Sequence, residues 1–489
     1  MNDNYLKNVY LKDIEISENF KNLLISNLNF DQLIAVINLK GYFLIIAGAG
    51  SGKTRVIIYR TILLLKLQIP EKNILVLTFT RKATNEIKNR LNSFFPNSNV
   101  QIETFHSLAY KLLKKFSSNK TFKLLTPEDF FILSKNCSSY KKISKLLKKD
   151  ALVKLFNKTE SEILNDFYFK KLNKTSQADF IFFLNELNSL KVKDNIYSFS
   201  DLLTELLKLL ELNLIPINFE YIMIDEYQDT DIIQVKILKL LAKKNNLMAV
   251  GDDFQSIYSF KGALIENILN FSKDFSSVKT FILKENYRSS PEILNLSNEF
   301  SKSLKQCFRK KLITKNSSIK KPTLSIFKSH SDEIIYIYNK IKQILEENKL
   351  ASITILFRNF IYMKEFIKYF KELKLNFSII SNPFLENIFK DESFTNNSNI
   401  NLLTIHSSKG LEWDYVFIPL LLDGIIPSCI GENINLEEEK RLFYVALTRA
   451  KKEIFLSYSL NFYNEYGFFS IPSPFIDNIN SNFFNIKRG

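Results

Sequence analysis

Eight consecutive residues near the start of the chain have the residue types and spacing of a phosphate-binding loop. They read Ala47-Gly48-Ala49-Gly50-Ser51-Gly52-Lys53-Thr54, with Ala47 in the position where such loops usually begin with glycine. In these loops backbone N–H groups face the phosphates, the lysine contacts the β- and γ-phosphates, and the threonine hydroxyl holds Mg²⁺. The apolar run before the loop and the amphipathic pattern after it predict the required strand and helix. The sequence therefore predicts a nucleotide site with Mg²⁺.

Two adjacent carboxylates provide the partner that such a loop needs for hydrolysis. Asp225 and Glu226 directly follow Tyr221-Ile222-Met223-Ile224, an apolar run that predicts a buried strand. Asp225 is placed to hold Mg²⁺, directly or through water, and Glu226 to orient and deprotonate the attacking water. A strand ending in Asp-Glu is weak evidence by itself, but it becomes strong evidence beside a phosphate loop.

Residues suited to phosphates and bases follow another strand-like run, Leu247–Gly251. Gln255 is placed to sense the γ-phosphate. Tyr258 and Phe260 offer aromatic faces for base stacking, which contributes about 1–3 kcal/mol per base. The alternative is that both rings belong to the hydrophobic core.

Polar and aromatic residues also collect where two further predicted strands end, with Phe79 after 74–77 and His106 after 101–105. The carboxyl ends of parallel strands meet at one edge of a sheet, so these residues could form a track for a phosphate backbone. Ordinary polar strand ends are an equally good interpretation of the local sequence.

The elements that must hold these residues fall into two α/β units and a helical stretch. Strands alternating with helices predict a parallel sheet in residues 1–109 and 199–277. In residues 110–198 glycine disappears and helical periodicity dominates, which predicts an all-helical insertion. The second unit is expected to span 278–489, with strands at 280–283, 323–327, 352–357, 377–380 and 401–405.

A helix expected at 437–450 would place Arg441 and Arg449 two turns apart on roughly one face. The alternative reading is a helix stabilised by pairs of glutamate and lysine.

Length and charge limit the class of protein and its partners. A chain of 489 residues with 46% hydrophobic residues can bury several cores. The net charge of +16 favours a polyanionic partner, although the lysine enrichment could also reflect an AT-rich genome. The three cysteines form no metal or redox pattern, and neither a signal peptide nor a membrane span is evident. We therefore expect a cytoplasmic protein with no membrane partner.

Taken in order, the motifs resemble those of superfamily 1 DNA helicases of the UvrD/Rep/PcrA type. The resemblance covers most of residues 20–460 and rests on the phosphate loop with Asp225-Glu226-Tyr227-Gln228-Asp229-Thr230, Gly251-Asp252-Asp253-Phe254-Gln255-Ser256-Ile257-Tyr258, Asn286-Tyr287-Arg288-Ser289 and Tyr444-Val445-Ala446-Leu447-Thr448-Arg449-Ala450. It implies an α/β fold with two RecA-like, parallel-sheet P-loop NTPase lobes, called 1A and 2A. ATP and Mg²⁺ would lie between the lobes, and single-stranded DNA would cross both sheets. Residues 110–198 correspond to the insertion called 1B.

The resemblance also implies roles for individual residues. Beside the loop, the nucleotide site would include Gln32, Arg55, Tyr287, Arg288, Glu412 and Arg449. Gln32 would bind the adenine edge. Without the resemblance, the local sequence around Gln32 favours an ordinary exposed glutamine on a helix. Tyr287 would stack on the base, and Arg288 and Arg449 would act on the transferring phosphoryl group as arginine fingers. Phe79, His106, Phe260, Thr404 and His406 would contact single-stranded DNA, as would Tyr258.

Two departures from the family pattern bear on function. Lys261 stands where arginine is usual, and a lysine cannot form the bidentate contacts of an arginine. Only about forty residues, among them the polar loop 391–399, separate Arg358 from Asn401. Members of the family carry a large helical insertion there, called 2B, which is expected to be missing from this chain.

The expected function is that of an ATP-dependent translocase and helicase on single-stranded DNA and its junctions with duplex, with 3′–5′ polarity. Two alternatives stay open. One is a translocase that displaces proteins from DNA and unwinds little. The other is a scaffold in which ATP hydrolysis gates a repair or replication protein.

Overall fold

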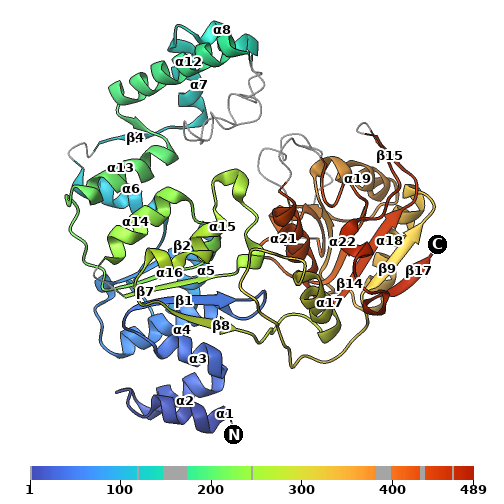
Figure 1. Cartoon of the computed structure of the whole chain (residues 1–489), viewed down its shortest axis with the longest axis horizontal. Coiled ribbons are helices and arrows are strands. Elements are labelled where there is room, and N and C mark those ends of the chain that lie inside the picture. Colours follow the sequence, from blue (N-terminus) through green and yellow to red (C-terminus); the bar gives the residue numbers. More distant parts are fainter. Residues whose placement is uncertain are drawn as a thin grey trace.

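The computed structural model of the chain contains two α/β lobes that lie side by side, with an insertion projecting from the first (Figure 1). It describes residues 3–117, 121–146, 173–243, 246–380, 398–429, 435–464 and 467–489. One lobe is built around a six-stranded sheet and the other around a seven-stranded sheet. The predicted fold class of two parallel-sheet lobes is confirmed. No helix in the described part of the chain has the length and apolar character of a membrane span.

The sheet of the first lobe has the strand order β3-β2-β6-β7-β1-β8, and each neighbouring pair is parallel. Leu44 and Ile46 pack into one core and Phe43 and Ile45 into another. Both faces are therefore covered, which is why the four central strands are mostly apolar, whereas the edge strands β3 and β8 carry polar residues. The strands are β1 (Tyr42–Ala47), β2 (Ile74–Thr78), β3 (Gln101–Thr104), β6 (Tyr221–Ile224), β7 (Asn246–Gly251) and β8 (Lys279–Leu283).

The boundary between the lobes lies later in the chain than predicted. Residues 280–283 were expected to open the second unit, yet they form β8, which pairs with β1 at the edge of the first sheet. The boundary at 277 is therefore wrong by one strand. An apolar run has the same pattern in either sheet, and only its pairing partner assigns it.

Helices cover the first sheet, and the loops at the carboxyl ends of its strands carry most of the predicted site residues. The phosphate loop joins β1 to α4 in this way. The helices are α1 (Asp3–Leu11), α2 (Glu18–Asn27), α3 (Phe30–Ile37), α4 (Lys53–Lys66), α5 (Arg81–Asn92), α6 (Phe105–Phe116), α13 (Phe199–Glu211), α14 (Ile232–Ala242), α15 (Ile265–Leu269) and α16 (Phe271–Asp274).

The insertion between α6 and α13 is helical over most of its described length. Its helices α7 (Pro127–Asn136), α8 (Tyr140–Leu146) and α12 (Lys174–Lys193) share a small core that includes Phe180 and Phe183. The expected all-helical insertion also contains a two-residue parallel ladder between β4 (Lys123–Leu124) and β5 (Ile196–Tyr197). Strands this short leave no periodic pattern in a sequence.

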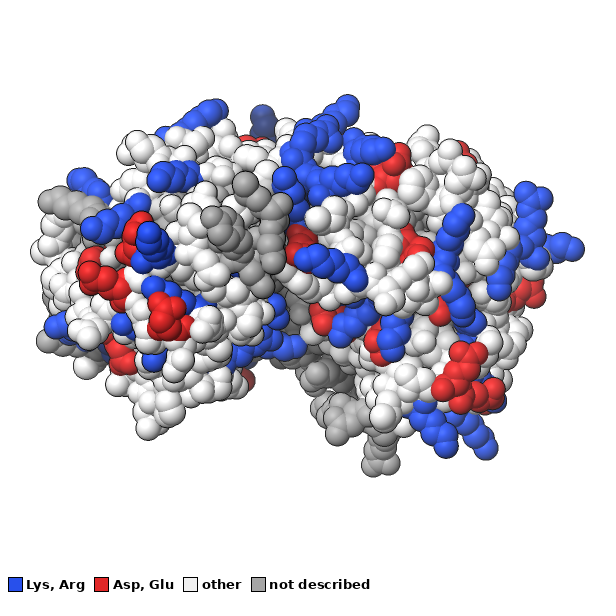
Figure 2. Space-filling view, turned by 90° about the horizontal axis from the view of Figure 1, so that it is seen from below, with Lys and Arg blue, Asp and Glu red and all other residues white. Residues whose placement is uncertain are grey.

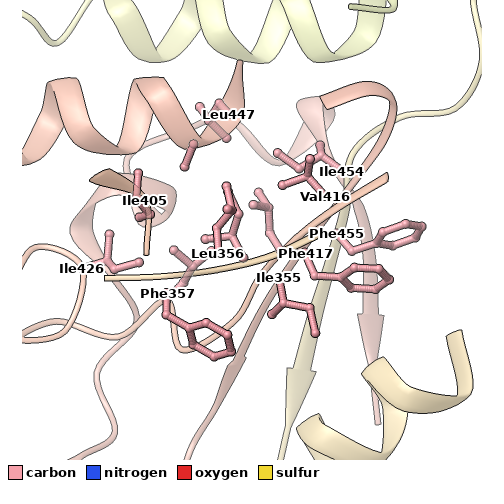
Figure 3. Close-up of a cluster of buried hydrophobic side chains, with 14 of the residues drawn as sticks. Ile355, Leu356, Phe357, Ile405, Val416, Phe417, Ile426, Leu447, Ile454 and Phe455 are labelled. Atoms are coloured by element: carbon pink, nitrogen blue, oxygen red, sulfur yellow. The ribbon is translucent and has the colours of Figure 1, made fainter. Parts of the chain in front are cut away.

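The second lobe has the strand order β11-β12-β10-β13-β14-β9-β17, with parallel neighbours throughout. Its core includes Ile355, Phe417 and Phe455 from three strands, and the rings of Phe417 and Phe455 stack at 4.7 Å (Figure 3). The strands are β9 (Thr323–Phe327), β10 (Ile353–Phe357), β11 (Ser378–Ile379), β12 (Ile400–Thr404), β13 (Trp413–Ile418), β14 (Ala450–Ser459) and β17 (Asn485–Arg488). A separate antiparallel pair is formed by β15 (Phe462–Asn464) and β16 (Gly467–Phe469).

The helices of the second lobe are α17 (Pro291–Ser301), α18 (His330–Glu347), α19 (Met363–Glu372), α21 (Leu436–Leu447) and α22 (Pro474–Asp477). α21 lies on the side that faces the first lobe (Figure 1). The helix predicted at 437–450 ends earlier than expected, at Leu447, because Ala450 already pairs with Trp413 of β13. Arg449 lies beyond the helix and not on a shared helical face with Arg441, which corrects that expectation.

Two segments carry the chain between the lobes. Residues 284–290 run from β8 to α17, and residues 302–322, here called the return segment, pass back across the first lobe before β9. The two segments pair through a bridge between Glu285 and Ile313. The return segment is fixed to the first lobe by Lys310, whose Nζ lies 2.9 Å from Asp252 Oδ1 and also pairs with Asp253.

Candidate ATP-binding and DNA-binding site

The phosphate loop has the backbone shape that its sequence predicts. Gly50 and Gly52 have φ values of 66° and 85°, which favour glycine and let the chain curl before α4. α4 begins at Lys53, and the N–H groups of a first helical turn have no intrahelical acceptor. They lie at the positive end of the helix dipole and suit phosphate oxygens. The loop therefore fits a polyphosphate.

Four consecutive carbonyl groups of this loop, those of residues 48–51, accept hydrogen bonds from donors within the protein. Gly48 O accepts from Ser51 N at 3.2 Å and from Ser51 Oγ at 2.8 Å. The next three carbonyls accept from donors outside the loop. Asn286 Nδ2 donates to Ala49 O at 2.7 Å, and Tyr287 N donates to Gly50 O at 2.9 Å. Gln32 Nε2 donates to Ser51 O at 2.8 Å. The loop is thus held in its curled form before nucleotide arrives.

Lys53 and Glu226 face each other in the nucleotide site, with Lys53 Nζ 3.0 Å from Glu226 Oε1. Burial opposes the charge on Lys53, but nearby carboxylates, first of all Glu226, outweigh it and raise the pKa of the ammonium group. Burial also opposes the charge on Glu226, and Lys53 and then Lys409 outweigh it, which lowers the pKa of the carboxyl group to about 2. Glu226 is therefore ionised at neutral pH, as a general base must be.

Asp225 and Thr54 supply oxygen ligands that suit Mg²⁺. Asp225 is buried and accepts a hydrogen bond of 2.9 Å from Glu226 N. Burial and the neighbouring charge of Glu226 raise the pKa of Asp225 to about 7. A divalent cation would stabilise such a carboxylate. Among the described residues no group of three His, Cys, Asp or Glu side chains could hold a metal, so Mg²⁺ would share its ligands with phosphates and water.

Both predicted arginine fingers reach this site from the second lobe side. Arg288 Nε donates to Glu412 Oε2 at 2.6 Å, and Arg288 Nη1 donates to Thr448 O at 2.9 Å. Arg449 is buried, and its Nη2 donates to Gln255 Oε1 of the first lobe at 3.2 Å. Burial and then the charge of Arg288 lower the pKa of Arg449 to about 9. Two arginines that oppose each other's charge in this way suit an added anion.

Tyr287 and Arg55 lie together at another part of the site. The guanidinium carbon of Arg55 lies 5.6 Å from the centroid of the Tyr287 ring, and the Tyr287 hydroxyl accepts from Asn29 Nδ2 at 2.7 Å. The ring is 42% exposed, so a base can stack on it where Arg55 now lies.

Gln32 is buried, which corrects the reading of an exposed helical residue. Its Oε1 accepts from Asn29 N at 3.1 Å in a capping box of α3, while its Nε2 is bonded to Ser51 O. One amide hydrogen and one lone pair are left for another partner. Its role in reading adenine stays a prediction.

A chain of hydrogen bonds, buried except at its partly buried Glu226 end, connects Glu226 to Arg449 across the lobes. Gln228 Nε2 donates to Glu226 Oε2 at 2.5 Å, and Gln228 Oε1 accepts from Asp252 N at 2.9 Å. Gln255 Nε2 donates to Asp252 Oδ2 at 2.6 Å, and Arg449 closes the chain on Gln255 Oε1. Hydrogen bonds therefore connect the candidate base of one lobe, Glu226, to a candidate arginine finger of the other lobe, Arg449.

Three further residues of this site, Gln228, Asn286 and Lys409, had no role in the sequence analysis. Gln228 and Asn286 lie inside segments that it quoted, and Lys409 lies between His406 and Glu412, which it named. Lys409, from the second lobe, forms a buried ion pair with Asp229 Oδ2 at 2.6 Å and donates to Gln255 O at 2.6 Å. The signal for all three was their position beside residues that already had roles.

Four aromatic rings form a row that passes from the first lobe to the second. Phe79 stacks on Tyr258 with centroids 5.7 Å apart, Tyr258 meets Phe260 at 5.9 Å, and Phe260 meets His406 at 5.5 Å. Phe260 is 61% exposed, so its face is open to a base. We call these four residues the aromatic row, and it can hold unstacked bases.

The remaining two predicted DNA contacts are placed differently. The Thr404 hydroxyl lies 3.0 Å from that of Ser407, next to the row member His406. His106 packs edge-on against Phe199 of α13 with centroids 5.7 Å apart, and burial lowers its pKa. The side chain of Lys261 lies outside the described part of the structure.

Basic side chains lie over both lobes on the face seen in Figure 2, with acidic side chains among them. Together with the net charge of +16, this distribution suits a polyanionic ligand.

Known protein families match the chain over both lobes. The UvrD/REP helicase N-terminal domain matches residues 28–276, and the UvrD-like helicase C-terminal domain matches residues 281–385 and 384–461. These matches agree with the order of the motifs.

Three named relatives resemble the chain to different extents. A probable DNA helicase of Mycoplasma pneumoniae is 30% identical over 476 residues, which cover 90% of this chain and 85% of that protein. The ATP-dependent DNA helicase Rep of Buchnera aphidicola subsp. Acyrthosiphon pisum is 28% identical, covering 88% of this chain and 95% of that protein. The ATP-dependent DNA helicase PcrA of Staphylococcus epidermidis is 32% identical over 69% of this chain and 48% of its own length. With its motifs, two lobes and matching domains, the chain belongs to the UvrD/Rep family of DNA helicases.

Proposed function

We propose that the chain is an ATP-dependent DNA helicase that translocates on single-stranded DNA in the 3′–5′ direction. The observation that carries this proposal is the hydrogen-bond chain from Glu226 to Arg449, because it joins candidate catalytic groups of both lobes. The relatives named as ATP-dependent DNA helicases support the reaction. The polarity rests on the resemblance of the motifs alone.

ATP binding would exchange contacts that the protein already makes. Lys53 would leave Glu226 for the β- and γ-phosphates, and Arg288 and Arg449 would turn from Glu412 and Gln255 towards the γ-phosphate. Glu226, freed from Lys53, would accept a proton from the attacking water. Mg²⁺, held by Thr54 and Asp225, would neutralise phosphate charge when bound.

The ATP site and the aromatic row share one short stretch, residues 252–260. Asp252 and Gln255 belong to the hydrogen-bond chain, whereas Tyr258 and Phe260 belong to the row. The contact between Phe260 and His406 spans the two lobes. Closure and release of the lobes would therefore change the grip on the bases during each ATP cycle.

We also propose that the second lobe lacks a 2B insertion and that the enzyme unwinds at least short duplexes. The C-terminal domain matches in two pieces that meet at residues 384–385, within the stretch 381–397 that lies outside the described residues. The alignment with the Buchnera Rep protein runs over 616 residues, more than the 489 of this chain, so parts of that relative fall opposite gaps. Both observations support a shortened second lobe.

A translocase that displaces proteins and unwinds little is the second candidate. The shortened second lobe favours it, because a smaller lobe offers less surface to duplex DNA. The motor parts are the same in both candidates.

Strand displacement on tailed duplexes tests the proposal. With ATP and Mg²⁺, we expect release of the short strand from a duplex with a 3′ single-stranded tail and little release from one with a 5′ tail. A control with a nonhydrolysable ATP analogue should release neither. Release from the 5′ tail alone would refute the polarity, and ATP-driven displacement of a bound protein without strand release would favour the second candidate.

Glu226→Gln tests the candidate base. The amide keeps the shape of the side chain but cannot accept a proton, so we expect ATP binding to persist and hydrolysis to fall by about 10²–10⁴-fold. Equilibrium titration with a fluorescent ATP analogue and steady-state ATPase rates measure the two effects. Hydrolysis at the rate of the unaltered protein would exclude Glu226 as the base.

Phe260→Ala tests the aromatic row. Loss of one stacking face should weaken binding of single-stranded DNA by about 1–3 kcal/mol, while ATP binding stays unchanged. Fluorescence anisotropy with labelled oligothymidylate measures the affinity. Phe94→Ala, at another ring that is 41% exposed, is the matched control and should bind DNA normally. Equal affinity in both variants would remove Phe260 from the DNA site.

A further inference from the structure

Asn286 lies between the phosphate loop and the candidate finger Arg288. It is 1% exposed, and its Nδ2 donates to Ala49 O of the loop at 2.7 Å. Its Oδ1 accepts from Arg288 N at 2.9 Å and from Ser289 N at 2.8 Å. One side-chain amide therefore ties a loop carbonyl to the backbone that carries the finger.

The contact is close enough to require glycine at position 50. A Cβ atom there would come within 2.7 Å of Arg288 Cβ and 2.8 Å of Asn286 Nδ2. Tyr287 N adds a hydrogen bond of 2.9 Å to Gly50 O. Residues 286–288 thus pack directly on the loop, and the missing side chain of Gly50 makes room for them.

The far end of this segment is anchored in the second lobe, beside the other finger. Ser289 Oγ donates to Ala450 O at 2.7 Å, and Ser290 N donates to Lys451 O at 2.9 Å. Both acceptors directly follow Arg449 in the chain. The segment therefore spans from the phosphate loop to the start of β14 through hydrogen bonds at both ends.

We propose that Asn286 is a positioning residue, which fixes the backbone of Arg288 relative to the phosphate loop so that the finger meets the γ-phosphate. The inference rests on the proposed ATP hydrolysis and adds a buried residue whose hydrogen bonds are made within the protein. Asparagine suits this place because it combines a donor for the loop with an acceptor for two N–H groups. Aspartate keeps only the acceptor, and alanine keeps neither.

The test compares ATPase kinetics of Asn286→Ala, Asn286→Asp, Arg288→Ala and the double variant Asn286→Ala/Arg288→Ala, all with saturating single-stranded DNA. A misplaced finger should lower kcat about 100-fold in Asn286→Ala while the affinity for a fluorescent ADP analogue changes little. Asn286→Asp should lose a similar factor, because its carboxylate faces the Ala49 carbonyl without a donor. The double variant should be no slower than Arg288→Ala, because Asn286 acts through the finger.

Asn461→Ala is the matched control, since Asn461 Nδ2 donates to Lys328 O at 3.1 Å within the second lobe. Its kcat should equal that of the unaltered protein. Normal kcat in Asn286→Ala and Asn286→Asp, or losses that multiply in the double variant, would overturn the inference. Should Asn286→Ala fail to fold by circular dichroism, Asn286→Asp decides. No ATP hydrolysis by the unaltered protein would instead refute the proposed function.

Discussion

The architecture depends on how the carbonyl groups of the phosphate loop find donors. A loop that turns its N–H groups towards phosphates must turn its carbonyls into the protein, where unpaired polar atoms cost free energy. Here the donors come from Gln32 of α3 and from Asn286 and Tyr287 of the segment that leads to the second lobe. The same hydrogen bonds that stabilise the loop thus hold the candidate adenine site and the path to the second lobe in place.

The charges of the site follow a similar logic. Each cationic group that we propose for phosphate binding already contacts an acceptor within the protein. Lys53 pairs with Glu226, Arg288 pairs with Glu412, and Arg449 donates to Gln255. A buried charge without a partner is costly, so these contacts keep the site folded and define what a nucleotide must replace. In the proposed exchange Glu226 would be released from Lys53, which would link nucleotide binding to activation of the candidate base.

The motifs and several strands could be predicted from the sequence, whereas the pairing of the strands and the contacts between the lobes could not. The phosphate loop, Asp225-Glu226 and the strand 323–327 lie where the patterns place them, because glycine spacing and apolar runs are local signals. β8 was assigned to the wrong sheet, because strand pairing is set by distant residues. β13 and β14 were not predicted, although each contains an apolar run, at 416–418 and 454–456. The positions of Gln228, Asn286 and Lys409 in the site could be recognised only from the structure, since each side chain connects elements that are far apart in the chain.

We propose that the candidate ATP site and the aromatic row form one connected unit through residues 252–260. The most direct measurement is the steady-state ATPase rate of the full chain, with and without single-stranded DNA, at saturating ATP and Mg²⁺. We expect the rate to rise as DNA fills its site and to return to the basal level when high salt releases the DNA. An ATPase rate that stays the same while DNA is shown to be bound would contradict it.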